Sequence, residues 1–484
     1  MITKLIFDWA KQTPDRTAVI YNGHHWSYRS FAQIISVARG YFARRGYVGP
    51  GYAVLAIQNL INFWILSLAL RSLGLTTIAV PSAATVRKLG LPNVRCVITS
   101  PGATIAGLED LCAELGVPLL SVLLAGEPTL GFDAHETSEP FGGHILLTSG
   151  TTGTYKMVLW GSAVEADQWR HRVKVFGLNH DTVFCVFGFW PWTGPGYHWP
   201  TSAWTVGGAT LIEQGSEPYM ALVRPGITHA TLIPAMLDKI LVAPAGAFPR
   251  NEALQLVVGG GIMTGPQVDQ AKARITPRLF SRIACTEAGT IAFTSQDTAE
   301  DRKWHQLAPD RVVEVVDESD RPVSTGQIGR LRVSTAGGPT SYLHNEAATQ
   351  AFFKDDFFYT GDLAVMRSDG RVALQGRVTD VINLQGNKIS PAPIEDRLGE
   401  LFGVSGVCLF SMPDDDGEEM IYVVIESPTP IDSERLIAAL NQEFQGGFLR
   451  ACVHCVAALP RNESGKILRQ AVRTKVVGSR RATG

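Results

Sequence analysis

The sequence contains little charge, and the charges that it has nearly cancel. Only 18% of the 484 residues are charged, and 43 lysines and arginines face 45 aspartates and glutamates, which gives a net charge of −2. A near-neutral chain is poorly suited to nucleic acid or an anionic membrane surface, so we expect neither as a main partner. Because 45% of the residues are hydrophobic, the composition also excludes disorder for most of the chain and requires a large buried core.

Long hydrophobic runs are also missing. The most apolar stretch, residues 60–70, is interrupted by Asn62 and stopped by Arg71, so it is shorter than the ~20 residues that a membrane-spanning helix needs. Asp8 and Lys11 interrupt the first apolar segment, which disfavours a secretory signal. We therefore expect a cytoplasmic protein without a membrane span, in which the seven cysteines are free thiols.

The cysteines do not form a zinc-binding pattern. Cys452 and Cys455 make one CxxC pair, but no second pair exists to supply the four ligands of a structural zinc site. The segment 448–459 reads as a strand, in which residues three apart point to opposite faces. We therefore expect these cysteines to serve packing.

Apolar runs of strand length alternate with helical patterns through the first part of the chain, which favours parallel sheets covered by helices. From residue 311 the apolar residues alternate with period two, as antiparallel strands do. After residue 380 a compact unit of strands and one helix follows. The predicted fold class is therefore α/β: a large N-terminal domain of packed α/β subdomains with an antiparallel β region, and a small α+β C-terminal domain.

One segment has the composition of a phosphate-binding loop. Residues 148–156 read TSGTTGTYK and directly follow the apolar run 145–147. Glycines let backbone N–H groups approach phosphate oxygens, hydroxyls donate further bonds, and Lys156 adds a positive charge. The spacing is not that of a Walker A loop, because no GK[ST] is present. By composition alone, a polar surface turn explains this segment as well as phosphate binding does.

Three further segments could each serve a function or could be ordinary surface structure. Glu287, among small residues, could hold a hard cation or could be an exposed loop carboxylate. Asp362 could accept the two hydroxyls of a ribose or could belong to an ordinary hairpin turn. Lys466, after a glycine near the C-terminus, could be a catalytic cation or a solvated charge. The occurrence of all these segments in this order favours the functional explanation of each one.

Together, the segments resemble the motifs of the adenylate-forming superfamily, which comprises acyl- and aryl-CoA synthetases, peptide-synthetase adenylation domains and firefly-type luciferases. The resemblance covers nearly the whole chain and is closest in type to a stand-alone acyl- or aryl-acid CoA ligase. The superfamily patterns [ST]SGTTGxPKG, x-T-E, TGD, GRxxDxI and PxxxxGKxxR correspond to residues 148–157, 285–287, 360–362, 376–382 and 460–469.

The resemblance implies an adenylation core over residues 1–378 and a mobile lid domain over 379–484 that carries the catalytic lysine. It also implies an enzyme that works in two steps with ATP and Mg²⁺. The carboxylate of a hydrophobic acyl or aryl acid attacks the α-phosphate of ATP, which gives an acyl-adenylate and pyrophosphate. The thiol of CoA then takes the acyl group and AMP leaves.

Roles of single residues follow from the same resemblance. Lys466 would bridge the acid and the α-phosphate, Glu287 would hold Mg²⁺, and Thr286 would complete the catalytic set. The loop of Gly386, Asn387 and Lys388 would face the active site during transfer to the thiol. The expected nucleotide-binding residues are Thr148, Ser149, Gly150, Thr151, Thr152, Gly153, Lys156, Gly260, Gly261, Cys285, Asp362 and Arg377.

The expected acid pocket is unusually rich in aromatic residues. Large rings crowd residues 187–199, which as a set favour an apolar and even aromatic acid, although any single ring there could be core. No aspartate occurs between Asp181 and Asp238, which disfavours an ordinary α-amino acid. The expected pocket residues are Phe189, Trp192, Thr193, Gly196, Ile262 and Gly289.

Some positions depart from the superfamily pattern. Tyr155 and Met157 replace the proline and the second glycine of the loop, Ile283-Ala284 replaces an aromatic-glycine pair, and Thr379 occupies the hinge. Two alternatives therefore stay open. One is transfer to the phosphopantetheine of a separate carrier protein, or to an amine, with an unusual amino acid among the possible acids. The other is a non-catalytic member of the fold that binds a hydrophobic ligand.

Overall fold

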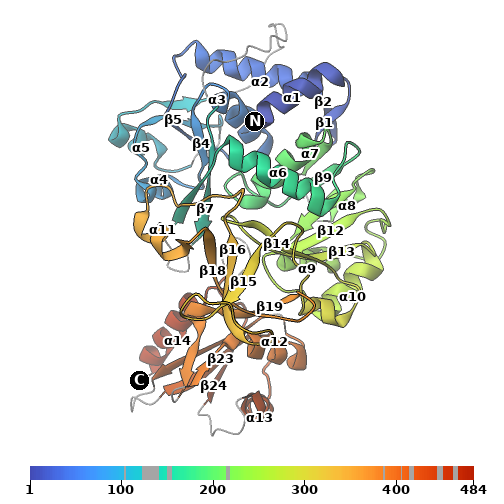
Figure 1. The fold of residues 1–484 in the computed structure, drawn as a ribbon, viewed down its shortest axis with the longest axis vertical. Helices are drawn as coiled ribbons and strands as arrows, with labels where there is room; N and C mark the ends of the chain where they lie inside the picture. The colour runs from blue at the N-terminus through green and yellow to red at the C-terminus, as the bar shows by residue number, and fades with distance from the viewer. Residues whose placement is uncertain are drawn as a thin grey trace.

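The computed structural model describes residues 1–102, 105–122, 141–149, 155–213, 219–384, 387–404, 406–413, 419–443, 451–461 and 467–483. Within these ranges the chain forms five sheets with helices packed between and around them (Figure 1). The predicted α/β class, with a large N-terminal part and a small C-terminal one, is confirmed. None of the described helices combines the length and the apolar character needed to cross a membrane.

The first sheet has six strands, of which five run parallel and β8 closes one edge antiparallel to β7. Its central strands are mostly buried apolar runs, as a sheet covered on both faces requires, whereas its edge strands are partly exposed. In spatial order they are β6 (Leu119–Ser121), β5 (Val94–Thr99), β3 (Tyr52–Ala56), β4 (Thr76–Ala79), β7 (His144–Ser149) and β8 (Tyr155–Trp160).

The second sheet has eight strands, with a parallel centre and an antiparallel strand at each edge. Two neighbouring strands, β12 and β13, pair in parallel, so that their carboxyl ends meet at the same side of the sheet. The spatial order is β14 (Gly289–Ser295), β13 (Leu279–Cys285), β12 (Gln255–Gly259), β11 (His229–Leu232), β9 (Val183–Phe187), β10 (Ala209–Glu213), β1 (Thr17–Tyr21) and β2 (His24–Ser27).

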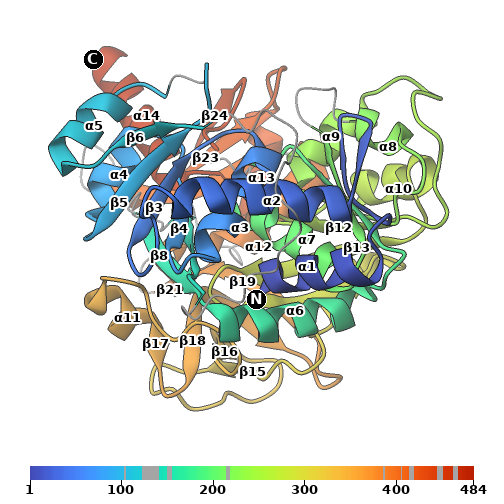
Figure 2. The same ribbon diagram turned by 90° about the horizontal axis from the view of Figure 1, so that it is seen from above.

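Helices fill the space between these two sheets, as the view from above shows (Figure 2). The most buried is α3 (Leu60–Arg71), whose start is capped by the Asn59 side chain accepting from the N–H of Asn62. The helices of the larger part also include α1 (Ile2–Gln12), α2 (Tyr28–Ala43), α4 (Ala83–Leu89), α5 (Leu108–Leu115), α6 (Ser162–Phe176), α7 (Gly194–Thr205), α8 (Met220–Val223), α9 (Pro234–Leu241) and α10 (Gly265–Arg274).

The third sheet is antiparallel, as the period-two pattern predicted. It positions the segment that contains Asp362 and Arg377. Its elements are β15 (Val313–Val316), β16 (Ile328–Ser334), β17 (Phe353–Lys354), β18 (Phe357–Met366) and β19 (Val372–Arg377), with α11 (Glu346–Phe352) beside them.

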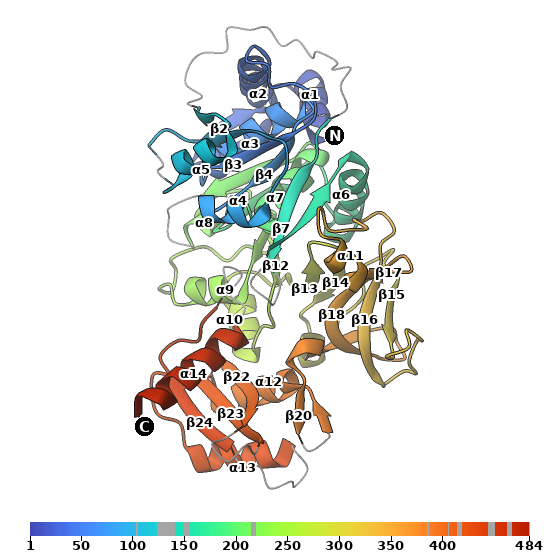
Figure 3. The ribbon, with the colours of Figure 1, turned by 90° about the vertical axis from the view of Figure 1, so that its left-hand side faces the viewer.

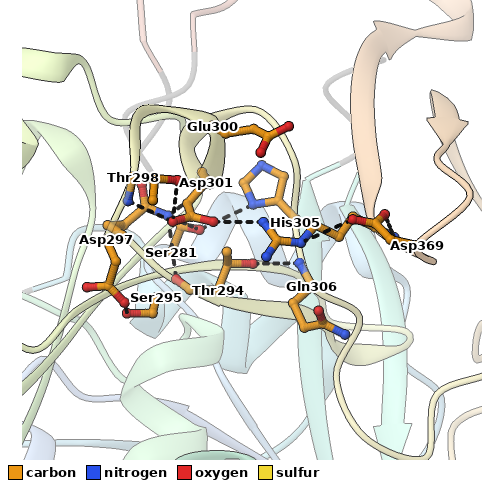
Figure 4. Close-up of polar contacts among 12 residues, drawn as sticks. Ser281, Thr294, Ser295, Asp297, Thr298, Glu300, Asp301, His305, Gln306 and Asp369 are labelled. Carbon is orange, nitrogen blue, oxygen red and sulfur yellow. Dashed lines mark hydrogen bonds and ion pairs between the residues drawn. The ribbon is translucent and has the colours of Figure 1, made fainter.

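A buried polar network ties this third sheet to the second one (Figure 4). The Asp301 carboxylate, in the short helix η1 (Ala299–Arg302), accepts from the Thr298 backbone and hydroxyl at 2.8 Å each and from Arg371 at 2.8 Å. His305 shares a 3.2 Å hydrogen bond with Ser281 of β13, and its backbone N–H donates to the Val372 carbonyl of β19 at 2.8 Å. Burial lowers the pKa of His305 to about 4, so the ring is neutral. The network therefore holds β13 and β19 in a fixed relation.

The C-terminal unit lies below the larger part (Figure 3) and joins it through η2 (Val378–Asp380). Its last helix, α14, was not predicted from the sequence. Arg469 at its start donates to Glu395 at 3.0 Å and forms an ion pair with Asp380 at 3.3 Å. In β24 the Cys452 thiol packs half-buried beside His454, whereas Cys455 is exposed, so the packing expectation holds for one of the two. The elements are β20 (Ile382–Leu384), β21 (Asn387–Ile389), α12 (Pro391–Phe402), β22 (Val407–Pro413), β23 (Glu419–Glu426), α13 (Ser433–Glu443), β24 (Ala451–Val456) and α14 (Arg469–Thr483).

Candidate active site

The ends of β7 and β13 bring the first two candidate segments to the same region. Thr148 and Lys156 face each other as a register pair of the β7–β8 hairpin, so the predicted phosphate loop connects these two strands. Glu287 lies in the short turn between β13 and β14 and is only 7% exposed. Beside it, Gly260 and Gly261 follow β12, which pairs with β13. Ligands of parallel α/β sheets bind beyond the carboxyl ends of the strands, which is where these residues lie.

Tyr342 links the two segments, although no sequence motif contains it. Its hydroxyl donates to Oε1 of Glu287 at 2.7 Å, and its ring lies 4.8 Å from the Lys156 ammonium. Phe352 of α11 lies on the same ammonium at 3.6 Å. Burial, followed by the nearby Glu287 carboxylate, raises the pKa of Tyr342, so it remains a donor. The tyrosine therefore orients the carboxylate while its ring face contacts the lysine.

Asp362 and Arg377 form the third part of the site. They are register partners of β18 and β19, and the Arg377 Nε lies 3.0 Å from the Asp362 Oδ1. Arg377 also donates to the Thr360 carbonyl at 2.7 Å, which fixes the guanidinium across the turn. This pair presents one carboxylate and one cation at the end of the third sheet.

The pKa shifts of Lys156 and Cys285 reflect charges from all three parts of the site. Burial lowers the pKa of Lys156, the Glu287 carboxylate opposes this shift, and Arg377 adds to it. Burial also raises the pKa of the Cys285 thiol, and the carboxylates of Glu287 and Asp362 raise it further. The Cys285 thiol is therefore neutral, and it interacts electrostatically with both carboxylates. Segments more than two hundred residues apart in the sequence therefore lie within electrostatic reach of one another.

The aromatic residues of the expected acid pocket divide into two groups. Tyr197 and Trp199 are fully buried in the core, and Tyr197 stacks on His144 with ring centroids 4.4 Å apart. Trp190, 43% exposed, stacks on the half-buried Trp192 with centroids 5.3 Å apart. The structure therefore assigns part of the predicted aromatic set to packing and leaves one stacked tryptophan pair near the surface.

Of the other predicted pocket residues, Phe189, Thr193 and Gly196 follow β9 in the chain and Ile262 follows β12. Thr193 caps α7 by accepting from the N–H of Gly196, and a Cβ on Gly196 would come within 2.3 Å of the Trp190 carbonyl, so this position requires glycine. Phe189 is half-buried, whereas Ile262, after β12, is 51% exposed. The expected pocket residues thus come from the segments that follow β9 and β12 in the chain.

Gly289 reveals a further residue that the sequence did not indicate. It has φ +70°, and a Cβ there would come within 2.2 Å of Oε1 of Gln168. Gln168, on α6, donates to the Gly337 carbonyl at 3.2 Å and accepts from Arg311 at 3.1 Å. Gln168 and Arg311 also line a cavity of about 360 Å³, but none of the predicted site residues lines it.

Several predicted residues lie outside the described part of the chain: Gly150, Thr151, Thr152, Gly153, Gly386 and Lys466. For Ser149, Asn387 and Lys388 the structure describes the backbone alone, with Asn387 and Lys388 on the β20–β21 hairpin. Thr286 is half-buried next to Glu287. At the altered Ile283-Ala284 pair, the β13–β14 register shifts by a bulge, which re-aims the residues before Cys285.

Replacing Tyr342 with phenylalanine should weaken the site without removing its carboxylate. The variant keeps the ring that contacts Lys156 and deletes the 2.7 Å bond to Glu287. Since a hydrogen bond to a charged group contributes about 1.5–3 kcal/mol, we expect roughly a tenfold rise in the KM for MgATP, measured by steady-state kinetics. An unchanged KM would show that the Glu287 carboxylate is held by other groups.

Comparison with known proteins identifies relatives over most of the chain. The pattern of a family described as AMP-binding enzyme matches residues 6–343. A salicylyl-CoA synthase / salicylate adenylyltransferase from Streptomyces sp is 27% identical over 98% of this chain and 93% of its own. A fatty acid–[acyl-carrier-protein] ligase from Streptomyces coeruleorubidus is 25% identical over 81% of each chain.

Solved structures share the fold. An o-succinylbenzoate CoA synthetase from Bacillus subtilis, in complex with the acyl-adenylate intermediate OSB-AMP, superposes with a TM-score of 0.82 at 17% identity over 97% of both chains. The same enzyme has been solved with ATP and a magnesium ion.

Proposed function

The chain belongs to the AMP-binding enzyme family, and on this premise we propose that it is an adenylate-forming ligase. It joins an acyl or aryl carboxylic acid to AMP with release of pyrophosphate, and then passes the acyl group to a thiol with release of AMP. One observation carries the proposal: Glu287, Lys156 and the Asp362–Arg377 pair come from three sheets and meet within electrostatic reach of one another.

In this proposal the chain supplies positioning and charge, which phosphoryl-centred displacement requires more than covalent help. Lys156 and the loop 148–153 bind the terminal phosphates, and Asp362 holds the ribose with Arg377 beside it. Gly260, Gly261 and Cys285 border the adenine. The second step uses the face formed by the loop 386–388.

The residues present fit Mg²⁺ carried by the nucleotide. No three histidine, cysteine, aspartate or glutamate side chains gather as a metal-binding group among the described residues. Mg²⁺ commonly uses only one or two protein carboxylates together with substrate phosphates and water, and Glu287 is a single carboxylate fixed by Tyr342. When bound, the ion shields the phosphate charge; the chain's part is to hold that carboxylate in place.

We also propose that residues 1–378 form the adenylation core and that residues 379–484 rotate as a lid which brings Lys466 to the acid. Few bonds cross the described boundary, which supports this division: Ser390 donates to the Gln375 carbonyl, and Arg302 lies 3.8 Å from Glu400. The exposed Thr379 in η2 is the hinge position.

CoA is the acceptor that we propose, and a carrier-protein phosphopantetheine is the second candidate. The relatives include both a CoA-dependent enzyme and a carrier-protein ligase. All seven cysteines are free thiols in the structure, which supports work in the reducing cytoplasm.

Exchange of labelled pyrophosphate into ATP tests the adenylation step. We expect exchange that depends on a carboxylic acid, and AMP release that then depends on CoA. The assay is run over a panel of acids, with CoA and with a holo-carrier protein as acceptors. Exchange without any effect of CoA, together with acyl transfer to the carrier, would favour the second acceptor. Exchange at the background rate with every acid would contradict the adenylation proposal and favour a non-catalytic protein that binds a hydrophobic ligand.

A further inference from the structure

The core around helices α3 and α6 buries more positive than negative charge. Arg71 and Glu165 form an ion pair at 2.7 Å, and both side chains are fully buried. Arg172, two turns of α6 further and 1% exposed, has no ion pair of its own among the described residues. A buried charge is costly unless it is paired, so the Arg172 guanidinium needs an explanation.

Several polar atoms around Arg172 also lack a partner. Arg172 donates from Nε to the Ser202 hydroxyl at 2.7 Å, but its buried Nη2 has no hydrogen-bond partner in the described structure. The same holds for Nδ1 of His198, which is 5% exposed, and for the indole N–H groups of Trp160 and Trp199. Buried polar groups are almost always satisfied. Of these four atoms on α6, α7 and β8, the three N–H donors have no acceptor among the described residues, although Oε1 of Glu165, which attracts Arg172, is also without a hydrogen-bond partner.

A second guanidinium converges on the same place. Arg282 of β13 lies 4.8 Å from the Trp199 ring and donates from Nε to the Thr290 hydroxyl at 2.9 Å. Burial is the main cause that lowers the pKa of Arg172 to about 9 and that of Arg282 to about 10, and Arg282 lowers the pKa of Arg172 further. Burial, then the charges of both arginines, lowers the pKa of His198.

This cluster adjoins the walls of the expected acid pocket. Arg282 precedes Cys285 on β13, and the two side chains interact electrostatically. Thr290, its hydrogen-bond partner, follows Gly289 on β14. His198 and Ser202 lie on α7, the helix that begins after Trp192 and contains Gly196. Arg282 and His198 therefore lie on elements that also carry expected site residues, and Arg172 reaches α7 from α6 through its bond to Ser202.

We propose that the acid activated by this enzyme carries a second anionic oxygen group, and that Arg172 and Arg282, with His198, bind it. The inference rests on the adenylation function proposed above and names its substrate class: an aryl or acyl dicarboxylic acid, with one carboxylate at the nucleotide and the other at the arginines. A guanidinium matches a carboxylate with two parallel hydrogen bonds. The second carboxylate would satisfy Nη2 of Arg172 and balance the buried positive charge.

Selectivity follows from the same contacts. A monoacid of equal size would leave the guanidinium unpaired in a buried site, and such a site discriminates strongly against a substrate that lacks the bonding group. We therefore expect kcat/KM for a benzenedicarboxylate, in whichever of its three isomers fits, to exceed that for benzoate at least tenfold. The measurement is acid-dependent pyrophosphate exchange, with phenylacetate and straight-chain mono- and diacids as further pairs.

Variants test the assigned residues. Arg172→Gln and Arg282→Gln should each lower the diacid-to-monoacid ratio of kcat/KM at least fivefold, with little change in the KM for ATP. Arg172→Lys, which keeps the charge, covers the case in which glutamine impairs folding, and it should retain part of the preference. The matched control is Arg332→Gln, a buried arginine of β16 that is paired with Glu314; it should leave the ratio unchanged.

A binding measurement gives a readout separate from turnover. A diacid should raise the thermal unfolding midpoint of the unmutated protein more than its monoacid does, and Arg172→Lys should reduce that difference.

The outcomes separate the two proposals. Exchange with monoacids at rates equal to or above those with diacids would overturn the second-carboxylate site and leave the adenylation function standing. Stimulation of benzoate activation by added formate or acetate would support the site, because the free carboxylate would then pair with the arginines in place of the missing group. Exchange with no acid of either kind would overturn the adenylation function itself.

Discussion

Replacing Glu287 with glutamine should lower acid-dependent pyrophosphate exchange at least a hundredfold. The carboxylate is buried, oriented by Tyr342 and opposed by the Lys156 ammonium. Glutamine keeps the size and can still accept from Tyr342, but it removes the charge that a magnesium–nucleotide complex needs. Loss of one preorganised electrostatic group typically costs about 10²–10³ in rate, and loss of metal anchoring adds to this.

A nearby carboxylate provides the control for this variant. Glu346, exposed at the start of α11, contacts Gln350 and none of the site residues named here. Glu346→Gln should therefore exchange pyrophosphate at the unmutated rate. Wild-type rates for Glu287→Gln, with the fold intact by circular dichroism, would remove Glu287 from the catalytic set and with it the main support for the proposed site.

Removing Glu165 should destabilise the protein by about 3–5 kcal/mol, because it leaves Arg71 as an uncompensated charge in the core. Both side chains are fully buried, and Arg71 also donates to the Gly142 carbonyl at 3.1 Å and to the Tyr197 hydroxyl at 2.9 Å. The pair joins α3 to α6 and so fixes the helices between the two large sheets. Denaturant unfolding of Glu165→Ala measures the loss.

Two further variants make the interpretation specific. Arg71→Met combined with Glu165→Leu removes both charges and keeps the volume, and it should recover at least half of the lost stability. Recovery is incomplete because Gly142 and Tyr197 lose their donor. Glu114→Ala removes an exposed partner of Arg87 and should leave the unfolding midpoint nearly unchanged. Equal losses for Glu114→Ala and Glu165→Ala would contradict the role given to burial.

Local geometry explains why some of the motif residues lie together in pairs. Thr148 and Lys156 flank one hairpin, and Asp362 and Arg377 are register partners of another. Each pair is brought together by a turn or a strand pairing that its own segment encodes. The alternation of apolar runs also predicted β3, β4 and β12, and the shift to period two predicted β15 and β16.

Other features escaped prediction because they depend on packing between distant segments. Tyr342 has no motif, and only the approach of its segment to β13 places its hydroxyl on Glu287. The aromatic run 187–199 looked uniform in sequence, yet the start of α7 at Gly194 sends Tyr197 and Trp199 into the core and leaves Trp190 exposed. The excess of buried guanidinium around Arg172 is likewise invisible in a chain whose total charge is nearly zero.

The sequence by itself therefore determined the α/β class and the order of the strands along the chain, because apolar periodicity and turn residues act over a few residues. The tertiary structure alone decided which side chains come close together: Tyr342 with Glu287, and Arg172 with Arg282. Such contacts arise when sheets and helices far apart in sequence pack together, and the free energy of that packing belongs to the whole fold rather than to any one segment.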